Sequence, residues 1–315
     1  KYTYMKTILL SIVMMGAALT ADAQATVKVN FNKNDTTIYK DVFKVAIDLP
    51  MGQGSKSVTV TKNTRYVVLD KTPQGYKIEY NVVDTQFDGD KDVVEQAQVA
   101  GNQYLKGVKM ILQTNTDGKV EKILNLAEVA AAGSKNAIAD IEEDYKKAPE
   151  MEQILPKAKV LTAISEQFEE KALIDNLNET SFLFYYGKDL KKNSKEDIIK
   201  QGMKLTSTYT VANNGGNTVI TTNLKDNMTE SDVKKMMIDQ MKKMGMGDEV
   251  TSQIEVGWDQ MKAMGMTNIS ANGTDINTFL PNGWLQTQTG KASTKLMGMD
   301  MKFSTQSDIL YKNWK

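Results

Sequence analysis

Methionine is the only residue type with useful chemistry that this sequence contains in excess. The 315 residues include 19 methionines, and nine of them lie between Met228 and Met266. Met237, Met241 and Met244 share one stripe of a predicted helix. A thioether is flexible, polarizable and soft, so the stripe fits three roles: core filler, a deformable groove for a lipid-like ligand or a partner helix, or a Cu(I) site. We name these three methionines as candidate ligand-binding residues.

A second candidate is the apolar segment at 181–187, Ser-Phe-Leu-Phe-Tyr-Tyr-Gly. Such an aromatic run is typical of a buried strand or helix end, because these side chains remove a large apolar area from water. The alternative is an aromatic wall that faces a ligand. On that interpretation Phe184 and Tyr186 contact the ligand.

The chain has no histidine and no cysteine. This excludes a Ser-His-Asp triad, an imidazole zinc site, a thiol nucleophile and a disulfide. Asp84, Asp88, Asp90 and Asp92 gather on a predicted turn but lack the spacing and the final glutamate of a calcium loop. We therefore name no catalytic residue, metal site or cofactor. A hydrolase with paired carboxylates remains the main enzymatic alternative.

The charges indicate no polyanionic partner. Lysine plus arginine equal aspartate plus glutamate at 39 each, and Arg65 is the only arginine. Nucleic-acid recognition favours a basic surface and the guanidinium fork, so we expect no nucleic-acid partner.

The element around which the rest of the chain is organised is a predicted hairpin at 107–125. Val108, Met110 and Leu112 alternate, which places them on one face of a strand. Asp117-Gly118 predicts a two-residue type I′ turn, in which both residues have positive φ. Asn125 is then placed to cap the helix that follows.

Before this hairpin, apolar residues recur at every second position, which predicts strands. After it, they recur at helical spacing, which predicts helices. Hydrophobic residues make up 41% of the chain, enough for a sizeable core. Thr229 is placed to cap a second helical region that ends near Met264. An antiparallel sheet with helices over one face, an α+β fold, is the architecture that this order predicts. The predicted strands are 26–31, 38–49, 57–69, 76–83, 203–211, 218–224, 267–271, 275–279, 284–289, 293–297 and 301–310, and the predicted helices occupy 92–105, 126–199 and 229–264.

The order hairpin, helix, hairpin occurs twice, and the closing hairpins turn at Asp117-Gly118 and Asn282-Gly283. This suggests two similar halves, 24–190 and 191–315, that form one continuous fold. Asn272-Gly273 and Gly290 are further turn signals in the second half.

Residues 1–23 have the pattern of a signal peptide with a few upstream residues. Met5-Lys6 precedes an apolar run at 8–19, which is shorter than the roughly 20 residues of a membrane span. Ala21 and Ala23 form the small-x-small pattern of a cleavage site. We expect a periplasmic or secreted protein with no transmembrane segment in the mature chain.

The C-terminal segments Gly-Thr-Asp-Ile-Asn-Thr-Phe at 273–279, Asn-Gly-Trp-Leu at 282–285 and Met-Gly-Met-Asp-Met at 297–301 carry a resemblance. Together with the leader and the run at 112–129, they resemble a family of uncharacterised exported proteins from Bacteroidota. That resemblance implies a curved, half-barrel-like sheet similar to the LolA-like periplasmic lipoprotein carriers. It implies no catalytic residues.

These patterns favour a non-catalytic exported protein that binds a hydrophobic ligand or an envelope partner. The partner is a lipid-like small molecule or an envelope protein. A structural envelope protein, a carboxylate-based hydrolase and a Met-rich Cu(I) binder are the alternatives.

Signal-peptide cleavage after Ala23 makes Gln24 the first residue of the mature protein. N-terminal sequencing of the protein from the envelope fraction of its own host should therefore begin at or very near Gln24. A soluble envelope form that still carries Lys6 would contradict this.

Overall fold

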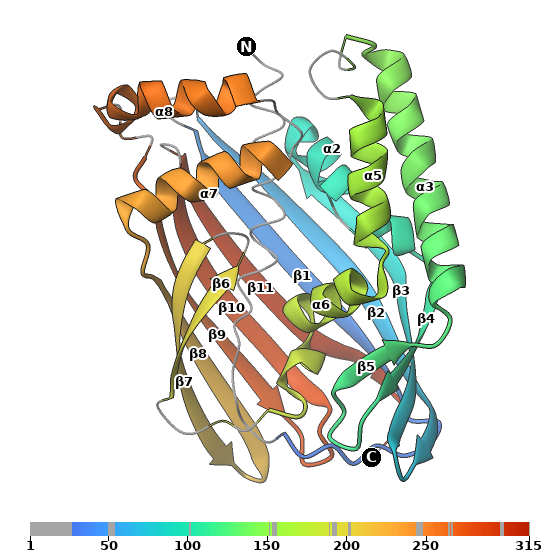
Figure 1. Ribbon diagram of the computed structural model, residues 1–315. Helices are drawn as coiled ribbons and strands as arrows, with labels where there is room; N and C mark the ends of the chain where they lie inside the picture. The colour runs from blue at the N-terminus through green and yellow to red at the C-terminus, as the bar shows by residue number, and fades with distance from the viewer. Residues whose placement is uncertain are drawn as a thin grey trace.

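The computed structural model describes residues 27–49, 54–100, 102–150, 152, 156–188, 190, 194–200, 203–243, 248–263, 265, 267–296 and 299–314. The signal-peptide prediction lies outside these residues. The described chain forms one curved antiparallel sheet of eleven strands with helices on its concave side (Figure 1), which confirms the predicted α+β class and curved sheet.

The first and last strands lie side by side at the centre of the sheet. The spatial order is β5-β4-β3-β2-β1-β11-β10-β9-β8-β7-β6, so the strands run outward from the β1–β11 pair to the edges β5 and β6. All of these pairs are antiparallel. The strands are β1 (Thr36–Asp48), β2 (Ser55–Thr72), β3 (Gly75–Gly89), β4 (Lys109–Thr114), β5 (Val120–Ile123), β6 (Lys195–Lys200), β7 (Met203–Asn214), β8 (Asn217–Asp226), β9 (Ser270–Phe279), β10 (Leu285–Leu296) and β11 (Met299–Lys312).

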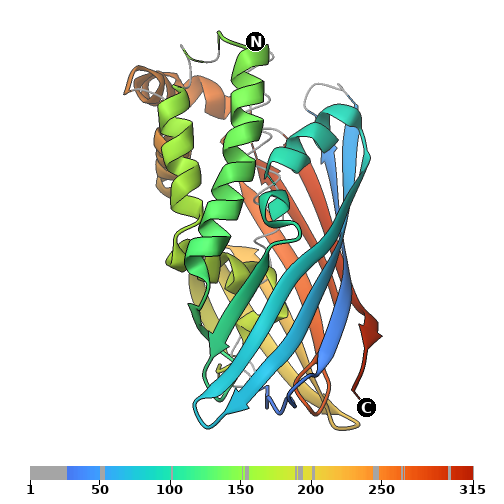
Figure 2. The same cartoon turned by 90° about the vertical axis from the view of Figure 1, so that its right-hand side faces the viewer.

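The helices cover the concave side in two groups, and both views show them on that side (Figures 1 and 2). One group follows β3 and β5, and the other lies between β8 and β9 in the chain. The helices are α2 (Lys91–Ala100), η2 (Asn102–Leu105), α3 (Leu126–Lys147), α5 (Lys157–Gln167), α6 (Glu170–Thr180), η3 (Phe182–Tyr185), α7 (Glu230–Lys243) and α8 (Asp248–Ala263).

Alternation along the strands explains which face the helices cover. In β1, Tyr39, Val45 and Ile47 are buried, whereas Lys40 and Lys44 are exposed. Side chains of a strand point alternately to the two faces, so the odd positions of β1 face the helices and the even positions face water. The concave face is therefore mainly apolar and the convex face polar.

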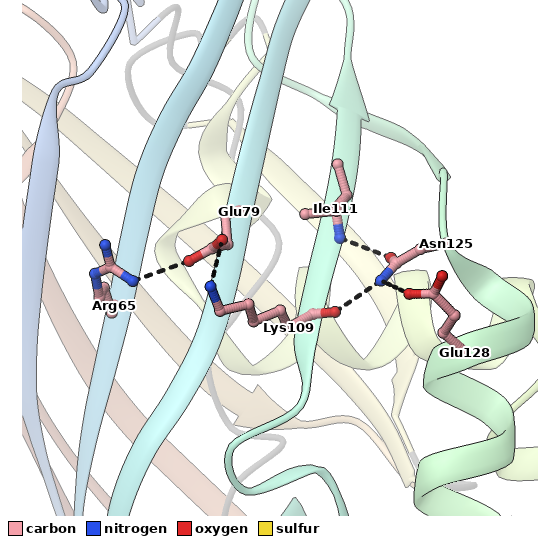
Figure 3. Close-up of polar contacts among 6 residues, drawn as sticks. All are labelled: Arg65, Glu79, Lys109, Ile111, Asn125 and Glu128. Carbon is pink, nitrogen blue, oxygen red and sulfur yellow. Dashed lines mark hydrogen bonds and ion pairs between the residues drawn. The ribbon is translucent and has the colours of Figure 1, made fainter.

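An ion-pair network crosses three strands on the convex face (Figure 3). Glu79 of β3 accepts a hydrogen bond from Arg65 of β2 at 2.9 Å, and its second oxygen lies 3.2 Å from the ammonium of Lys109 in β4. The Glu79 side chain is only 11% exposed. A carboxylate this covered needs such partners, because burial of an unpaired charge is costly. The single arginine of the chain is thus a structural residue.

Asn125 has a different role from the one predicted. It precedes α3, but its side chain does not cap the helix. Its amide instead accepts from Ile111 N and donates to Lys109 O, both at 2.9 Å, which ties the start of α3 to the edge of β4 (Figure 3).

Three boundaries differ from the sequence predictions. A strand was predicted at 26–31, but residues 27–31 form no strand, although Val27 and Phe31 are buried. The helical region ends before β6, since 195–200 pairs with β7. Asn272-Gly273 and Gly290 make no turns, because β9 and β10 run straight through them.

The turn after β4 is one residue longer than the predicted type I′ turn. Gly118 N donates to Asn115 O at 3.1 Å, and Asn115 N donates to Lys119 O at 3.0 Å. Gly118 has the predicted positive φ of 85°, but Asp117 does not. Leu280, Gly283 and Trp284 repeat this bonding pattern at the second hairpin. A Cβ at Gly118 would lie 2.9 Å from both Tyr186 and Val29.

We therefore expect Gly118→Val to destabilise the protein more than Gly107→Val does. Both glycines have positive φ, and such strain costs about 1–3 kcal/mol at a β-branched residue. Only Gly118 adds steric overlap, because an added Cβ at Gly107 meets nothing within 4 Å. Thermal melts check this, since each kcal/mol lowers Tm by about 2 °C in a chain of this size. Equal decreases in Tm would contradict the contact with Tyr186.

Candidate functional site

The concave face of the sheet carries three bands of side chains, which we call the aromatic cluster, the polar row and the upper apolar surface. They follow one another along the strands, from the end where the C terminus lies to the end where α7 and α8 cross the sheet (Figure 1). Register fixes the bands, because side chains opposite each other on antiparallel strands share a face.

The aromatic cluster fills the end of the concave face near the C terminus. The η3 segment inserts Phe182, whose ring centroid lies 5.0 Å from Tyr39 and 5.1 Å from Tyr66. Trp284 is fully buried and its ring lies 4.2 Å from Phe31. Edge-to-face and tilted pairs at these distances are favourable aromatic contacts, so this end has a dense core. The cluster consists of Phe31, Tyr39, Tyr66, Phe182, Tyr185, Tyr186, Phe279 and Trp284.

The two aromatic candidates from the sequence lie at this end. Tyr186 is fully buried, and its hydroxyl donates to the Gly283 carbonyl at 2.8 Å. Phe184 is also buried, and the ammonium of Lys188 lies 3.2 Å from its ring centroid. The structure thus places the 181–187 segment in the core, which matches the first of its two interpretations. The predicted ligand contacts of Phe184 and Tyr186 remain predictions.

Burial shifts the titration of the tyrosines in this cluster. Burial raises the pKa of Tyr186 well above its usual value, and it raises the pKa of Tyr39 and Tyr66 in the same direction. For Tyr185, burial is the main cause of the raised pKa, and the nearby Asp275 carboxylate adds to it. All four hydroxyls therefore stay protonated in the folded state at neutral pH.

The polar row crosses seven strands about halfway along their length. Lys62 lies opposite Asp41, Asp41 opposite Ser307, and Ser307 opposite Gln288. The row continues through β9, β8 and β7. Its members are Lys62 (β2), Asp41 (β1), Ser307 (β11), Gln288 (β10), Asn277 and Asp275 (β9), Thr222 (β8) and Tyr209 (β7).

Asp275 is the most buried carboxylate of this row, 4% exposed. Gln288 donates to its Oδ1 at 3.0 Å, and Tyr185 donates to its Oδ2 at 3.2 Å, with a further bond from Asn277. Gly290 makes room for it, because a Cβ there would lie 2.8 Å from Oδ1. The glycine that resembles a turn signal is thus the packing partner of a buried acid.

Asp41 and Lys62 face each other across β1 and β2 without closing an ion pair. The Asp41 carboxylate accepts from Thr64 at 2.8 Å and from the hydroxyl of Ser307. Among the residues that the structure describes, none forms a hydrogen bond or ion pair with the ammonium of Lys62.

The two carboxylates of the polar row lie on strands that are not adjacent in the sheet. Asp41 and Asp275 lie on β1 and β9, three strand spacings apart. At about 4.8 Å per spacing this is about 14 Å. Carboxylate pairs in glycosidases are only about 5–9.5 Å apart, which is closer than the strands that carry these two acids.

The upper apolar surface lies on the α7–α8 side of the polar row. Phe43, Val60 and Phe87 are direct register partners on β1, β2 and β3. All three face the concave side yet are only half-buried, as is Ala292 of β10. Phe43 also stacks on Phe303 with ring centroids 6.2 Å apart. Apolar side chains in the middle of a covered face normally lose contact with water, so this surface is incompletely covered.

The methionine stripe lies partly within the described chain. Met237 is buried on α7 together with Val233 and Met236. The side chain of Met241 and the whole of Met244 lie outside the described residues, so the stripe stays a prediction there. Thr229 caps α7 as predicted, because Asp232 N donates to Thr229 Oγ1 at 3.2 Å.

Two features are absent from the part of the chain that the structure describes. No described helix is long and apolar enough to cross a membrane. In the same part of the chain, no group of three or more histidine, cysteine, aspartate or glutamate side chains is placed to hold a metal ion.

Comparisons with known proteins place this chain in no family. No family model matches it, and no curated protein matches it. A structure titled "Lipid-protein interactions in lipovitellin" is similar over 90% of this chain at 9% identity, with a TM-score of 0.42. The match covers only 26% of that longer chain. A likeness this distant carries no argument about function.

The buried tyrosines predict a loss of stability at high pH. Their folded-state pKa values lie above the usual value of about 10, so only unfolded chains release these protons as pH rises past that point. Because the folded state then holds more protons than the unfolded state, the free energy of unfolding falls as pH rises above about 10. Below that pH these tyrosines do not change it. Tyrosinate absorbance and circular dichroism, recorded together from pH 8 to 12.5, should show the last ionisations coinciding with unfolding. Ionisation of all 12 tyrosines near pH 10 in a folded chain would contradict the burial.

Proposed function

We propose that this protein binds a long-chain apolar ligand on the upper apolar surface, between the sheet and its helices, without catalysing a reaction. The observation that carries the proposal is the half-burial of Phe43, Val60 and Phe87 on the covered face of the sheet. Small-molecule sites are mostly apolar, with a few polar groups that orient the ligand. The polar row supplies such groups beside this surface.

The packing of the core supports the upper apolar surface as the location of the ligand. The aromatic cluster is closely packed, so it leaves its end of the sheet filled. The apolar residues beyond the polar row retain contact with water although they face the helices. A ligand that covered them would gain about 25 cal/mol for each Å² of apolar surface removed from water.

The methionine candidates fit the same proposal. Met237 lies on α7, one of the helices over the concave face, and methionine adapts its shape to varied apolar partners. We also propose that the protein acts outside the cytoplasm. The leader-like residues 1–23 and the resemblance to exported Bacteroidota proteins support that place.

Val60→Trp tests the proposal, because a large ring at the centre of the upper apolar surface occupies the space of the ligand. We expect the affinity for an uncharged environment-sensitive dye such as Nile red to fall about ten-fold or more, which is about 1.4 kcal/mol. Fluorescence titration of the purified protein measures this. Native mass spectrometry of protein from its own host would show a co-purifying lipid directly.

Val42→Trp is the matched control. Val42 is also half-buried, and it lies on the adjacent β1, but it faces the convex side opposite Thr61. Dye affinity should therefore remain that of the unmodified protein. The proposal fails if the unmodified protein binds no dye and carries no lipid, or if both variants change affinity equally.

A further inference from the structure

Lys62 lies where the polar row meets the upper apolar surface. Its partners across the sheet are Asp41 and Thr85, and the next inward residue of its own strand is Val60. The register shift beside Lys62 places its extra residue, Val83, on β3, so the alternation of β2 itself continues. Lys62 therefore faces the concave side like Val58 and Tyr66. A lysine is thus placed at the inner edge of an apolar surface.

The neighbouring charged side chains are bonded to other partners and do not contact Lys62. Lys56, another inward-facing lysine of β2, forms an ion pair with Asp92 of α2. Asp41 lies opposite Lys62, but the hydroxyls of Thr64 and Ser307 occupy its oxygens. Within the described chain, the Lys62 ammonium has neither an ion pair nor a hydrogen bond.

The charge of Lys62 persists in this position. Burial alone would lower the pKa of its ammonium, but the neighbouring Tyr80 and Asp41 outweigh burial and raise that pKa. Asp41 attracts the Lys62 ammonium without contacting it, so a ligand carboxylate at this position would add the hydrogen bonds that the ammonium lacks and further charge attraction.

We propose that the ligand is an anionic amphiphile whose carboxylate binds the Lys62 ammonium while its alkyl chain covers Phe43, Val60 and Phe87. This inference rests on the proposed function and names the ligand class. From Lys62 to the start of β2 at Ser55 the strand extends for about 24 Å at 3.4 Å per residue, which accommodates a long chain.

A single carboxylate fits the local charges better than a phosphate. Lys62 offers one point charge, and the nearby Asp41 opposes a second negative charge on the ligand. The bidentate fork that suits phosphate is absent from this place, because Arg65 lies on the convex face and binds Glu79.

The experiment compares hexadecanoate with hexadecan-1-ol, two ligands that share a chain and differ in charge. Each ligand is titrated against Nile red bound to the unmodified protein and to the variant Lys62→Met, and its affinity is measured by displacement of the dye. We expect the variant to bind hexadecanoate about ten-fold more weakly and hexadecan-1-ol with unchanged affinity. Lys62→Arg should restore hexadecanoate binding, because it restores the charge. Lys44→Met removes an exposed lysine of the convex face and should change neither affinity.

Unchanged dye affinity in Lys62→Met shows that the variant is folded and that its apolar surface is intact. The inference is overturned if the variant binds hexadecanoate as tightly as the unmodified protein does, or if the unmodified protein does not prefer hexadecanoate over the alcohol. Tighter binding of hexadecyl phosphate than of hexadecanoate overturns the carboxylate assignment. Displacement of dye by neither ligand instead contradicts the proposed function itself.

Discussion

The pairing of β1 with β11 is the interaction on which the rest of the structure depends. It joins the strands that follow Thr36 to those that precede Lys312, and it makes one curved surface out of two sets of strands. The polar row and the upper apolar surface both cross this junction, because Asp41 lies opposite Ser307 and Val45 lies opposite Phe303. A shift of one residue in the pairing would turn these side chains to the convex face. The register at the centre of the sheet therefore determines what the concave side presents to a ligand.

The alternating patterns made most of this architecture predictable. The strand predicted at 57–69 lies within β2, where Val58, Val60 and Tyr66 face inward. The same alternation carried a signal for Lys62, a charged residue at an inward position, which the sequence analysis did not recognise. The helical spacing after Leu126 and the cap at Thr229 were also informative, because local periodicity and capping depend on neighbouring residues alone.

Long-range contacts explain what the sequence could not predict. Gly273 and Gly290 resemble turn residues, yet they lie inside strands, where Gly290 leaves room for the carboxylate of Asp275. Asn125 resembles a helix cap, but its amide bonds to the backbone of β4. Each outcome depends on a partner far away in the chain, and no local pattern contains it. The convergence of Lys62, Asp41 and Ser307 is of the same kind, because three separate strands supply them.

The central position of β1 also affects the order in which this protein can fold. Asn313 donates a hydrogen bond to the Asn34 carbonyl across 279 positions of the chain. One edge of β1 therefore remains unpaired until the last strand has been made, while β2 can pair with the other edge at once. Contacts of such high contact order form slowly, and an unpaired edge can recruit foreign strands in the meantime. Lys40 and Lys44 of β1 are exposed, and charged side chains of this kind disfavour pairing of an open strand edge with another chain.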